Sequence, residues 1–437
     1  MRRVLIFLLF VALPAVADTT VTLLHFSDYH SHALPFYTEQ GERGGIARAI
    51  AALKREKKSG ALVFSGGDTI NKGAPAWSDK YGCAEWPWLN GIVDAMAFGN
   101  HDADYGHEEF DRCRAAIRYP ILSANTPGFE RYRVFTVKGK RIGVFALAGS
   151  DFTKLVKTPG FTFGDPVAAA REVVRDLREK EHADAVVVIG HEQAEDDYAL
   201  ARSVPGIDLI FGSHSHLERD LTRIEGTDTW FISPSQYLTF ISRVELTFRS
   251  NGIGFRGRLV PVDAGLTEDR VVAKRVKSMQ RALENDPKYH ELFLPIGDLP
   301  QALSVAQLAQ RTLEVMRNVT QSDVALSTSS TFRQPLPKGP LTMELLLAAL
   351  PYENEIITCT MNGAQLQRLY DVNGTRKGSD SEAYVRGPDG IDPRKTYRVA
   401  TTDYMAFVSW KEVFDCDKTR SGLRVREELK KRLTSGN

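Results

Sequence analysis

The sequence predicts a large α/β domain followed by a smaller α+β domain. Apolar strands alternate with amphipathic helices from Asp18 to about Gly265, and this alternation is typical of a sheet covered by helices. From about Glu291 the predicted helices and strands no longer alternate. The chain has 437 residues, 43% of them hydrophobic and 25% charged, which is enough for two domains with separate cores.

The first 17 residues have the pattern of a secretion signal. Two arginines precede an apolar run from Val4 to Leu13, and Pro14-Ala15-Val16-Ala17 fits the small-x-small rule for cleavage. The run is too short to span a bilayer, and no later stretch reaches the roughly 20 apolar residues that a membrane helix needs. Residues 430–437 are polar and lack the tail of a lipid-anchor signal. We therefore expect a periplasmic or secreted protein without a stable membrane anchor, whose mature chain starts at Asp18.

The first predicted strand, from Thr20 to Phe26, ends just before Asp28-Tyr29-His30. Residues two apart share a face of an extended chain, so Asp28 and His30 can bind one ion together. The alternative is that Asp28 only caps the following turn. Gly44-Gly45 then opens an amphipathic helix that runs to Lys57.

The next two predicted strands also end in polar residues. The strand from Ala61 to Ser65 precedes Gly66-Gly67-Asp68, where two glycines allow a sharp turn that brings a carboxylate towards the neighbouring strand ends. The strand over 91–98 precedes Gly99-Asn100-His101-Asp102-Ala103-Asp104, which contains an amide, an imidazole and two carboxylates. Taken alone, each stretch is also compatible with an ordinary polar turn.

Four further strands and a helix complete the predicted α/β domain. The helix starts with an aspartate cap and a proline at Asp165-Pro166 and runs to about Lys180. The four strands cover 121–125, 141–147, 185–190 and 207–211. The chain has only ten histidines, and five of them come just after predicted strands: His30, His101, His191, His214 and His216. This placement indicates a shared role.

A helix over Thr267–Leu283 is predicted to link the two domains. The first domain then covers 18–265, the linker 266–290 and the second domain 291–437. In the second domain we expect helices near Gln307–Arg317, at Met343–Leu350 and from Gly363 to Tyr370. We expect a strand at Glu355–Met361.

Charge and cysteine content narrow the functional classes. Lys and Arg number 56 against 55 Asp and Glu, so the chain has no electrostatic footprint for nucleic acid, and local charge must bind any small anionic substrate. Four cysteines are compatible with disulfides in an oxidising compartment, in any of three pairings. Their positions suggest one pair in each domain, Cys83–Cys113 and Cys359–Cys416. No cysteines have CxxC spacing, so we expect no thiolate zinc site.

The polar residues after the strands form a set of possible metal ligands: Asp28, His30, Asp68, Asn100, His191, His214 and His216. Oxygen and imidazole ligands without thiolates favour Zn, Mn, Fe or Co over Ca²⁺. Seven ligands are too many for one tetrahedral ion but suffice for two divalent ions if Asp68 bridges them. Two cations and two carboxylates leave a net charge of about +2, which matches a phosphate dianion, and two-metal sites promote hydrolysis by activating water.

His101 is better placed as a proton donor or an electrostatic stabiliser than as a metal ligand. Asp104, three residues later, can orient and charge its imidazole. Asp102 is the competing partner, and we prefer Asp104.

The combination of Asp28-x-His30, Gly67-Asp68, Gly99-Asn100-His101-Asp102, Gly190-His191 and Gly212-x-His214-x-His216 resembles the calcineurin-like metallophosphoesterase superfamily. The two-domain layout and the signal sequence are similar to the periplasmic 5′-nucleotidase/UDP-sugar hydrolase family. The resemblance implies a four-layer α/β/β/α sandwich joined by a helix to a substrate-recognition domain. It also implies one metal site of Asp28, His30, Asp68 and His216, another of Asp68, Asn100, His191 and His214, and a His101–Asp104 dyad.

The second domain departs from the family pattern. The family's Asn-Gly-Gly-x-x-Arg appears as Thr328-Ser329-Ser330-Thr331-Phe332-Arg333, which keeps only the arginine, and Arg333 is expected to bind phosphate. Tyr352 replaces the Phe of Leu-Pro-Phe and can stack on a base, although it is also compatible with a core position. The motif that supplies a second ring is missing after Asp403-Tyr404, and Trp410 is the candidate substitute.

We therefore hypothesise an exported two-metal phosphoesterase that removes phosphate from nucleotides. One alternative is the same chemistry on a non-nucleotide or cyclic-nucleotide phosphoester, which the altered second domain favours. The other is a metal-stabilised binding protein without activity, although the complete set of ligands and the intact dyad argue against it.

Overall fold

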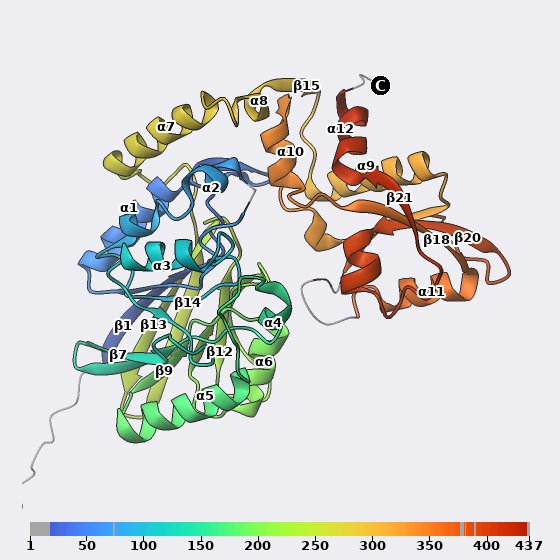
Figure 1. Cartoon of the computed structure of the whole chain (residues 1–437). Helices are drawn as coiled ribbons and strands as arrows, with labels where there is room; N and C mark the ends of the chain where they lie inside the picture. Colours follow the sequence, from blue (N-terminus) through green and yellow to red (C-terminus); the bar gives the residue numbers. More distant parts are fainter. Residues whose placement is uncertain (1–17, 73–74, 376–379, 381, 389, 435–437) are drawn as a thin grey trace, which may run out of the picture.

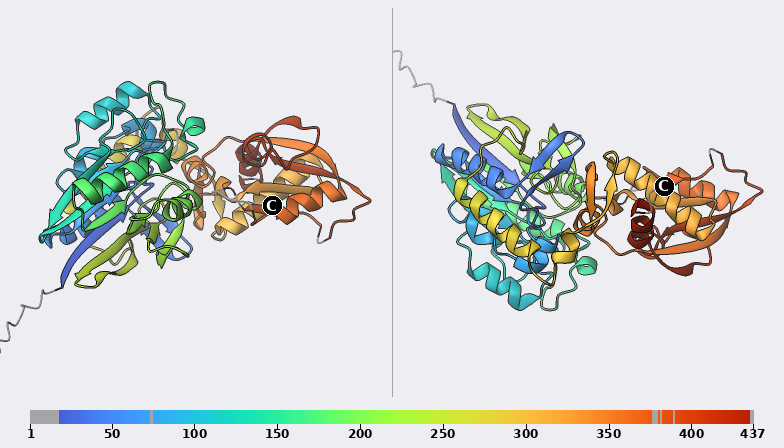
Figure 2. Two further views of the ribbon diagram at one scale, coloured as in Figure 1. Left: turned by 90° about the horizontal axis from the view of Figure 1, so that it is seen from below. Right: turned by 90° about the horizontal axis from the view of Figure 1, so that it is seen from above.

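The computed structural model describes residues 18–434, apart from 73–74, 376–379, 381 and 389. The predicted secretion signal, residues 1–17, lies outside the described residues. The chain forms two bodies that lie side by side (Figures 1 and 2). None of the helices within the described residues combines the length and the apolar character that crossing a bilayer requires.

The first sheet of the N-terminal body contains six strands in the order β14-β13-β1-β4-β5-β6. Strands β1, β4, β5 and β6 are parallel, and β13 joins β1 antiparallel. The strands are β1 Thr19–Phe26, β4 Leu62–Ser65, β5 Ala95–Ala97, β6 Ile121–Leu122, β13 Phe240–Arg249 and β14 Gly252–Pro261. A separate hairpin is formed by β2 Pro35–Thr38 and β3 Gly41–Gly44.

The second sheet also has six strands, in the order β11-β12-β10-β9-β8-β7. Its four central strands are parallel, and the two edge strands run antiparallel to their neighbours. The strands are β7 Tyr132–Val137, β8 Lys140–Phe145, β9 Ala185–Val188, β10 Leu209–Phe211, β11 Glu218–Arg223 and β12 Trp230–Pro234.

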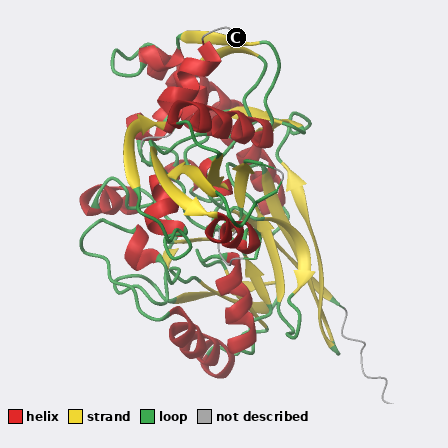
Figure 3. Ribbon diagram, turned by 90° about the vertical axis from the view of Figure 1, so that its right-hand side faces the viewer, coloured by secondary structure: helices red, strands yellow, loops and turns green. Residues whose placement is uncertain are grey.

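The two sheets pack face to face, and helices cover both outer faces. Residues of both sheets, such as Leu23, Phe64, Val187 and Phe211, share one buried apolar cluster between them. The outer face of the first sheet is covered by α1 Ile46–Lys58, α2 Ala76–Tyr81, α3 His107–Ala115 and α7 Arg270–Glu284. The outer face of the second is covered by α5 Pro166–Arg175 and α6 Ala194–Ser203. Figure 3 shows the strands between these helical layers. The predicted four-layer α/β/β/α sandwich is confirmed.

Local sequence explains where the helices begin. In α1, Ile46, Ile50 and Leu53 form the buried stripe that the periodicity predicts. The Asp165 side chain accepts a hydrogen bond from the Ala168 backbone N–H and so caps α5. The last residues of the predicted helix, Asp176–Lys180, form a π-helical turn rather than α-helix.

The predicted linking helix is part of the N-terminal body. Val272, Val276 and Leu283 of α7 are buried in the same cluster as α1 and α2, so this helix belongs to the outer layer. Figure 1 shows α7 lying beside α1. The chain then crosses to the second body through α8 His290–Phe293 and β15 Pro295–Leu299.

The C-terminal body has a five-stranded sheet in the order β19-β16-β20-β18-β21, with helices on both faces. Its strands are β16 Val324–Thr328, β18 Glu355–Asn362, β19 Ala383–Arg386, β20 Thr396–Thr402 and β21 Thr419–Arg424, and β17 Gly339–Thr342 pairs with β15. Its helices are α9 Val305–Thr320, α10 Met343–Ala349, α11 Gly363–Val372 and α12 Val425–Thr434. The disulfides Cys83–Cys113 and Cys359–Cys416 confirm the suggested pairing, one in each body.

Candidate metal centre

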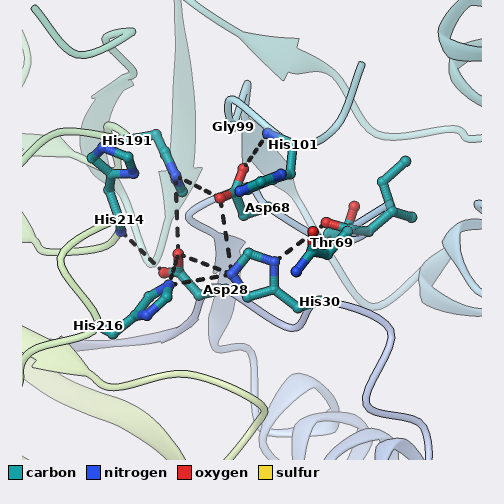
Figure 4. A network of polar contacts seen from close by, with 12 residues as sticks. Asp28, His30, Asp68, Thr69, Gly99, His101, His191, His214 and His216 are labelled. Carbon is teal, nitrogen blue, oxygen red and sulfur yellow. Dashed lines mark hydrogen bonds and ion pairs between the residues drawn. The ribbon is translucent and has the colours of Figure 1, made fainter. Parts of the chain in front are cut away.

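The possible metal ligands meet where strands of both sheets end. Asp28 and His30 follow β1, Asp68 follows β4, and Asn100 follows β5. From the second sheet, His191 follows β9, and His214 and His216 follow β10. The carboxyl ends of parallel strands lie at one edge of a sheet, so the topology brings these loops together. Figure 4 shows the side chains converging from the two sheets.

Two groups of side chains have the spacing of metal sites. In the first, the atoms of Asp28, His30 and His216 that can bind a metal lie within 4.8 Å of one another. His216 Nε2 is 3.2 Å from Asp28 Oδ1 and 3.2 Å from His30 Nε2. The second group contains Asp68, His191 and His214, with His191 Nε2 3.1 Å from Asp68 Oδ2.

The two groups are adjacent. His30 Nε2 of the first group is 3.9 Å from Asp68 Oδ2 of the second, and His191 Nε2 is 3.9 Å from Asp28 Oδ1. Asp68 therefore lies between the two sets of imidazoles, which is the position that a bridging carboxylate needs (Figure 4).

Buried polar atoms without hydrogen-bond partners gather at this point. Asp28 Oδ1, Asn100 Oδ1 and His191 Nε2 are all buried and form no hydrogen bond within the described chain, and the nearest groups to the first and last are the candidate ligands His216 and Asp68, at ion-pair distance. Burying such atoms without a partner is unfavourable. Carboxylate and amide oxygens and imidazole nitrogens bind divalent cations, so the residues present fit metal ions.

The backbone around the ligands is strained. Asp28, His30, Asp68, His214 and His216 all have left-handed φ values, between 48° and 58°. Non-glycine residues rarely adopt this conformation, and such strain is concentrated at functional sites. Gly99 is needed for a different reason, since a Cβ there would lie 2.2 Å from Asp68 N and 2.3 Å from Asp68 Oδ1.

In three of the histidines, one ring nitrogen is hydrogen-bonded to a backbone or carboxylate oxygen, and the other is free to bind a metal. His191 Nδ1 lies 2.6 Å from Gly66 O and His30 Nδ1 lies 3.3 Å from Ile70 O, which leaves both Nε2 atoms available to a metal. His214 differs, because its Nε2 lies 3.1 Å from Asp151 Oδ2 and Nδ1 remains available. Although burial opposes it, the hydrogen bond with His214 lowers the pKa of Asp151 to about 2.

Sequence analysis missed Asp151. This residue comes from the loop after β8 and follows no polar cluster at a strand end. The residues that follow β8, Ala146 and Leu147, give no indication of a ligand environment. Only the tertiary fold brings it to His214.

His101 and Asp104 form a close pair beside the ligands. His101 Nδ1 is 2.7 Å from Asp104 Oδ2, and the His101 backbone N–H donates to Asp68 Oδ1. Burial opposes a charge on the imidazole, but the carboxylates of Asp68 and Asp104 raise the pKa of His101 to about 10. Asp102 faces elsewhere, since its carboxylate accepts hydrogen bonds from the backbone of Asp68, Thr69 and Gly99 and thus ties two ligand loops together.

Arg333 reaches the centre from the C-terminal body. Its Nη1 lies 2.5 Å from His216 Nδ1, and its guanidinium carbon lies 5.7 Å from the centroid of the Tyr352 ring. Tyr352 is exposed, as is Tyr404, a ring that sequence analysis did not single out. The sequence did contain a signal for Tyr404, because Asp403-Tyr404 lies where the family motif with the second ring is missing.

The prediction for Trp410 is corrected. We expected its ring to stack on a substrate, but the side chain is fully buried in the C-terminal core with Phe414. Its Nε1 donates to the backbone oxygen of Asp380. The π-helical turn η4, Met405–Ser409, directs Trp410 back towards the sheet, and the ring offers no face to a substrate.

Comparison with protein families agrees with this architecture. Residues 21–218 match the calcineurin-like phosphoesterase family, and residues 299–387 match the 5′-nucleotidase C-terminal domain. Together these matches take in more than half of the chain. The N-terminal body thus contains a calcineurin-like phosphoesterase domain, and the C-terminal body contains a 5′-nucleotidase C-terminal domain. This fold and the two ligand groups indicate a site for divalent metal ions.

Relatives of this calcineurin-like phosphoesterase match along most of its length. Protein UshA of Yersinia enterocolitica is 24% identical over 88% of this chain and 85% of its own. The 5′-nucleotidase of Vibrio cholerae is 26% identical over 85% of this chain and 78% of its own. The crystal structure of a 5′-nucleotidase precursor from Thermus thermophilus has the same fold, with a TM-score of 0.74, 20% identity and coverage of 95% of this chain and 96% of that one.

Proposed function

We propose that this protein uses two divalent cations to hydrolyse phosphate monoesters, with nucleotides as substrates. The observation that carries the proposal is the pair of ligand groups that meet at Asp68, beside the His101–Asp104 pair. One ion would be held by Asp28, His30, Asp68 and His216, and the other by Asp68, Asn100, His191 and His214. Zn²⁺, Mn²⁺, Fe²⁺ and Co²⁺ all suit these ligands.

When bound, the two cations would activate a water and stabilise the charge that develops on the phosphoryl group. The residues of the chain supply the rest. The oxygen of a water bonds to phosphorus as the bond to the leaving oxygen breaks, and His101 donates a proton to that oxygen, so an alcohol and phosphate are released. Asp104 orients the His101 imidazole and favours its protonated form.

The C-terminal body would bind the leaving group and part of the phosphate. Arg333 contacts the centre from this side, and its planar guanidinium suits phosphate oxygens. The exposed rings of Tyr352 and Tyr404 are available to stack on a base. The relative from Vibrio cholerae bears the name 5′-nucleotidase, which supports a nucleotide substrate for this chain as well.

A second candidate is a phosphoesterase for a leaving group other than a nucleoside. Two observations favour it, since Trp410 is buried and the Arg333 guanidinium lies over the ring of Tyr352. Both reduce the aromatic surface that a base can use.

We also propose that the protein works outside the cytoplasm, in the periplasm or as a secreted enzyme. The signal-like pattern of residues 1–17 and the disulfides in both bodies support export to an oxidising compartment.

The test is a substrate panel on metal-loaded protein. We expect hydrolysis of AMP, the nucleotide monoester of the panel, to exceed that of UDP-glucose, 2′,3′-cyclic AMP and simple phosphate esters. Activity confined to esters without a nucleoside would reject nucleotides as substrates, and bound metal without turnover of any ester would reject the enzymatic proposal in favour of a binding role.

Two variants test the assignment of the ligands. Asp68→Ala and His191→Ala should each lower kcat by about a thousandfold or more while the protein stays folded, because each removes a ligand of the water-activating ions. Asp111→Ala, which removes an exposed carboxylate on α3, is the matched control and should keep full activity. Full activity of either ligand variant would contradict the assignment.

A further inference from the structure

The loop between β12 and β13 lies directly against the metal centre and carries Tyr237. The backbone N–H of Tyr237 donates to Asp28 O at 2.8 Å. Its ring stands edge-on to His30, with the ring centroids 5.8 Å apart, and lies 6.4 Å from the ring of His216. Tyr237 thus touches the group of ligands that Arg333 approaches from the other body.

The Tyr237 ring is held in one orientation. It stacks on His32 with centroids 3.6 Å apart and an interplanar angle of 18°, and Phe36 packs against it edge-on at 5.7 Å. His32 is itself fixed, because its Nδ1 lies 3.0 Å from His30 O. The position of the Tyr237 hydroxyl is therefore determined by packing before any ligand binds.

The loop maintains this orientation with a strained backbone. Ser235, Tyr237 and Leu238 all have left-handed φ values, between 57° and 65°, although none is glycine. The loop also packs tightly against Gly44, where a Cβ would lie 2.8 Å from Tyr237 O. Strain of this kind persists where the surrounding structure enforces it, and it is concentrated at functional sites.

The Tyr237 hydroxyl is a hydrogen-bond donor without a partner. The residue is only 4% exposed, and its hydroxyl makes no hydrogen bond to any residue in the described parts of the chain. An anionic oxygen bound beside Arg333 would supply an acceptor for this hydroxyl.

We propose that the Tyr237 hydroxyl and the Arg333 guanidinium together bind an oxygen of the phosphoryl group at the metal centre. This inference rests on the proposed function and deepens it, because it adds a phosphate-binding residue from the N-terminal body. Tyr237 contributes a neutral hydrogen bond, and Arg333 contributes charge.

The test replaces Tyr237 with Phe, which removes the hydroxyl but keeps the ring that stacks on His32. We expect the dissociation constant for inorganic phosphate, measured by calorimetry on metal-loaded protein, to rise about 10- to 100-fold, as for loss of a hydrogen bond to a charged group. The value of kcat/KM for the best ester should fall by a similar factor. Bound metal, measured by elemental analysis, and the circular dichroism spectrum should not change.

Tyr119→Phe is the matched control. Tyr119 is also buried, and its hydroxyl donates to Trp86 O within the helical layer, so its loss should leave phosphate binding unchanged. An unchanged phosphate dissociation constant in Tyr237→Phe would overturn the proposal. A wild-type protein that binds phosphate but hydrolyses no ester would instead contradict the proposed function, and the comparison of phosphate binding would still decide the role of Tyr237.

Discussion

Asp28 and Asp68 are almost completely buried, and backbone N–H donors together with the cationic or metal-binding groups around them offset the cost of this burial. Without metal, the His191 imidazole takes this role beside Asp68. Burial opposes a charge on His191, but the neighbouring Asp68 carboxylate raises its pKa to about 9. Bound metal ions would replace the proton on His191 as the source of positive charge at the site. Their affinity also depends on residues that hold the ligands in place without binding the metal themselves.

The first prediction concerns Asp151, which holds His214 through Nε2. Asp151→Ala should weaken metal binding about 10- to 100-fold, because the partner of a metal-binding histidine fixes the orientation of its ring. Titration of the metal-free protein with Zn²⁺ or Mn²⁺ in a calorimeter measures this directly.

The control for this prediction is Asp111→Ala, because Asp111 pairs with His107 at the same 3.1 Å distance on the exposed face of α3. It should leave metal affinity unchanged. Equal affinities of the Asp151 and Asp111 variants would show that His214 needs no carboxylate to hold it.

Sequence could predict the proposed ligands because each follows an apolar strand, and strand ends are readable from one segment at a time. Asp151 could not be predicted in this way, since its role depends on a partner 63 residues away. Trp410 shows the opposite error, because an aromatic residue near a missing motif fits a stacking role and a core position equally well. The π-helical turn before Trp410, visible only in the structure, shows that the core position is the correct one.

At the level of elements, the parallel strands were predictable, whereas the β13–β14 hairpin was not predicted. The two strands of the hairpin pair with each other. The hairpin is held in the sheet by the pairing of β13 with β1, more than 200 residues away, and such a distant pairing cannot be read from one segment of sequence. The predicted strand over 91–98 shrinks to β5 Ala95–Ala97, because the backbone turns at Leu89, where Ile92 N and Val93 N both donate to Leu89 O. Helix α7 was predicted as a linker, since sequence does not show what its apolar stripe packs against.

The second prediction concerns Glu85, a buried carboxyl between α2 and the short 3-10 helix η1, Trp86–Leu89. Burial raises its pKa to about 7, although Trp77 and Tyr29 donate hydrogen bonds to it. Between pH 4.5 and 7 the unfolded chain loses this proton while the folded protein keeps it, so stability falls as pH rises and is constant above pH 7. A shift of this size corresponds to about 3 kcal/mol.

Glu85→Gln should remove this pH dependence. Urea unfolding of metal-free protein should show the variant gaining stability relative to wild type from pH 4.5 to pH 7. Glu109→Gln is the control, because Arg112 lowers the pKa of Glu109, so the stability that this carboxylate contributes is constant above pH 4.5 and changes with pH only below that value. Parallel profiles for Glu85→Gln and wild type between pH 4.5 and 7 would exclude a raised pKa.

At the scale of the whole molecule, the candidate centre joins the two sheets of the N-terminal body and the C-terminal body. Its ligands come from the loops of both sheets, and Arg333 contacts His216 from the C-terminal body. Among the described residues, two further hydrogen bonds connect the bodies, from Ala76 N to Glu344 and from Val305 N to Glu39. Metal ions at this point would therefore cross-link the two sheets of the N-terminal body.

The last prediction follows from that cross-link. A ligand that binds only the folded state at about 1,000 times its dissociation constant adds about 4 kcal/mol of stability. For a body of about 250 residues this corresponds to a rise in Tm of about 10 °C. Chelation with EDTA should thus lower the Tm of the N-terminal body by this amount, and added Zn²⁺ or Mn²⁺ should restore it. Asp68→Ala should abolish the metal-dependent difference because both ions lose their shared ligand, whereas Asp111→Ala should keep it. If calorimetric scans showed the same Tm with and without metal in wild-type protein, the ions would not join the two sheets.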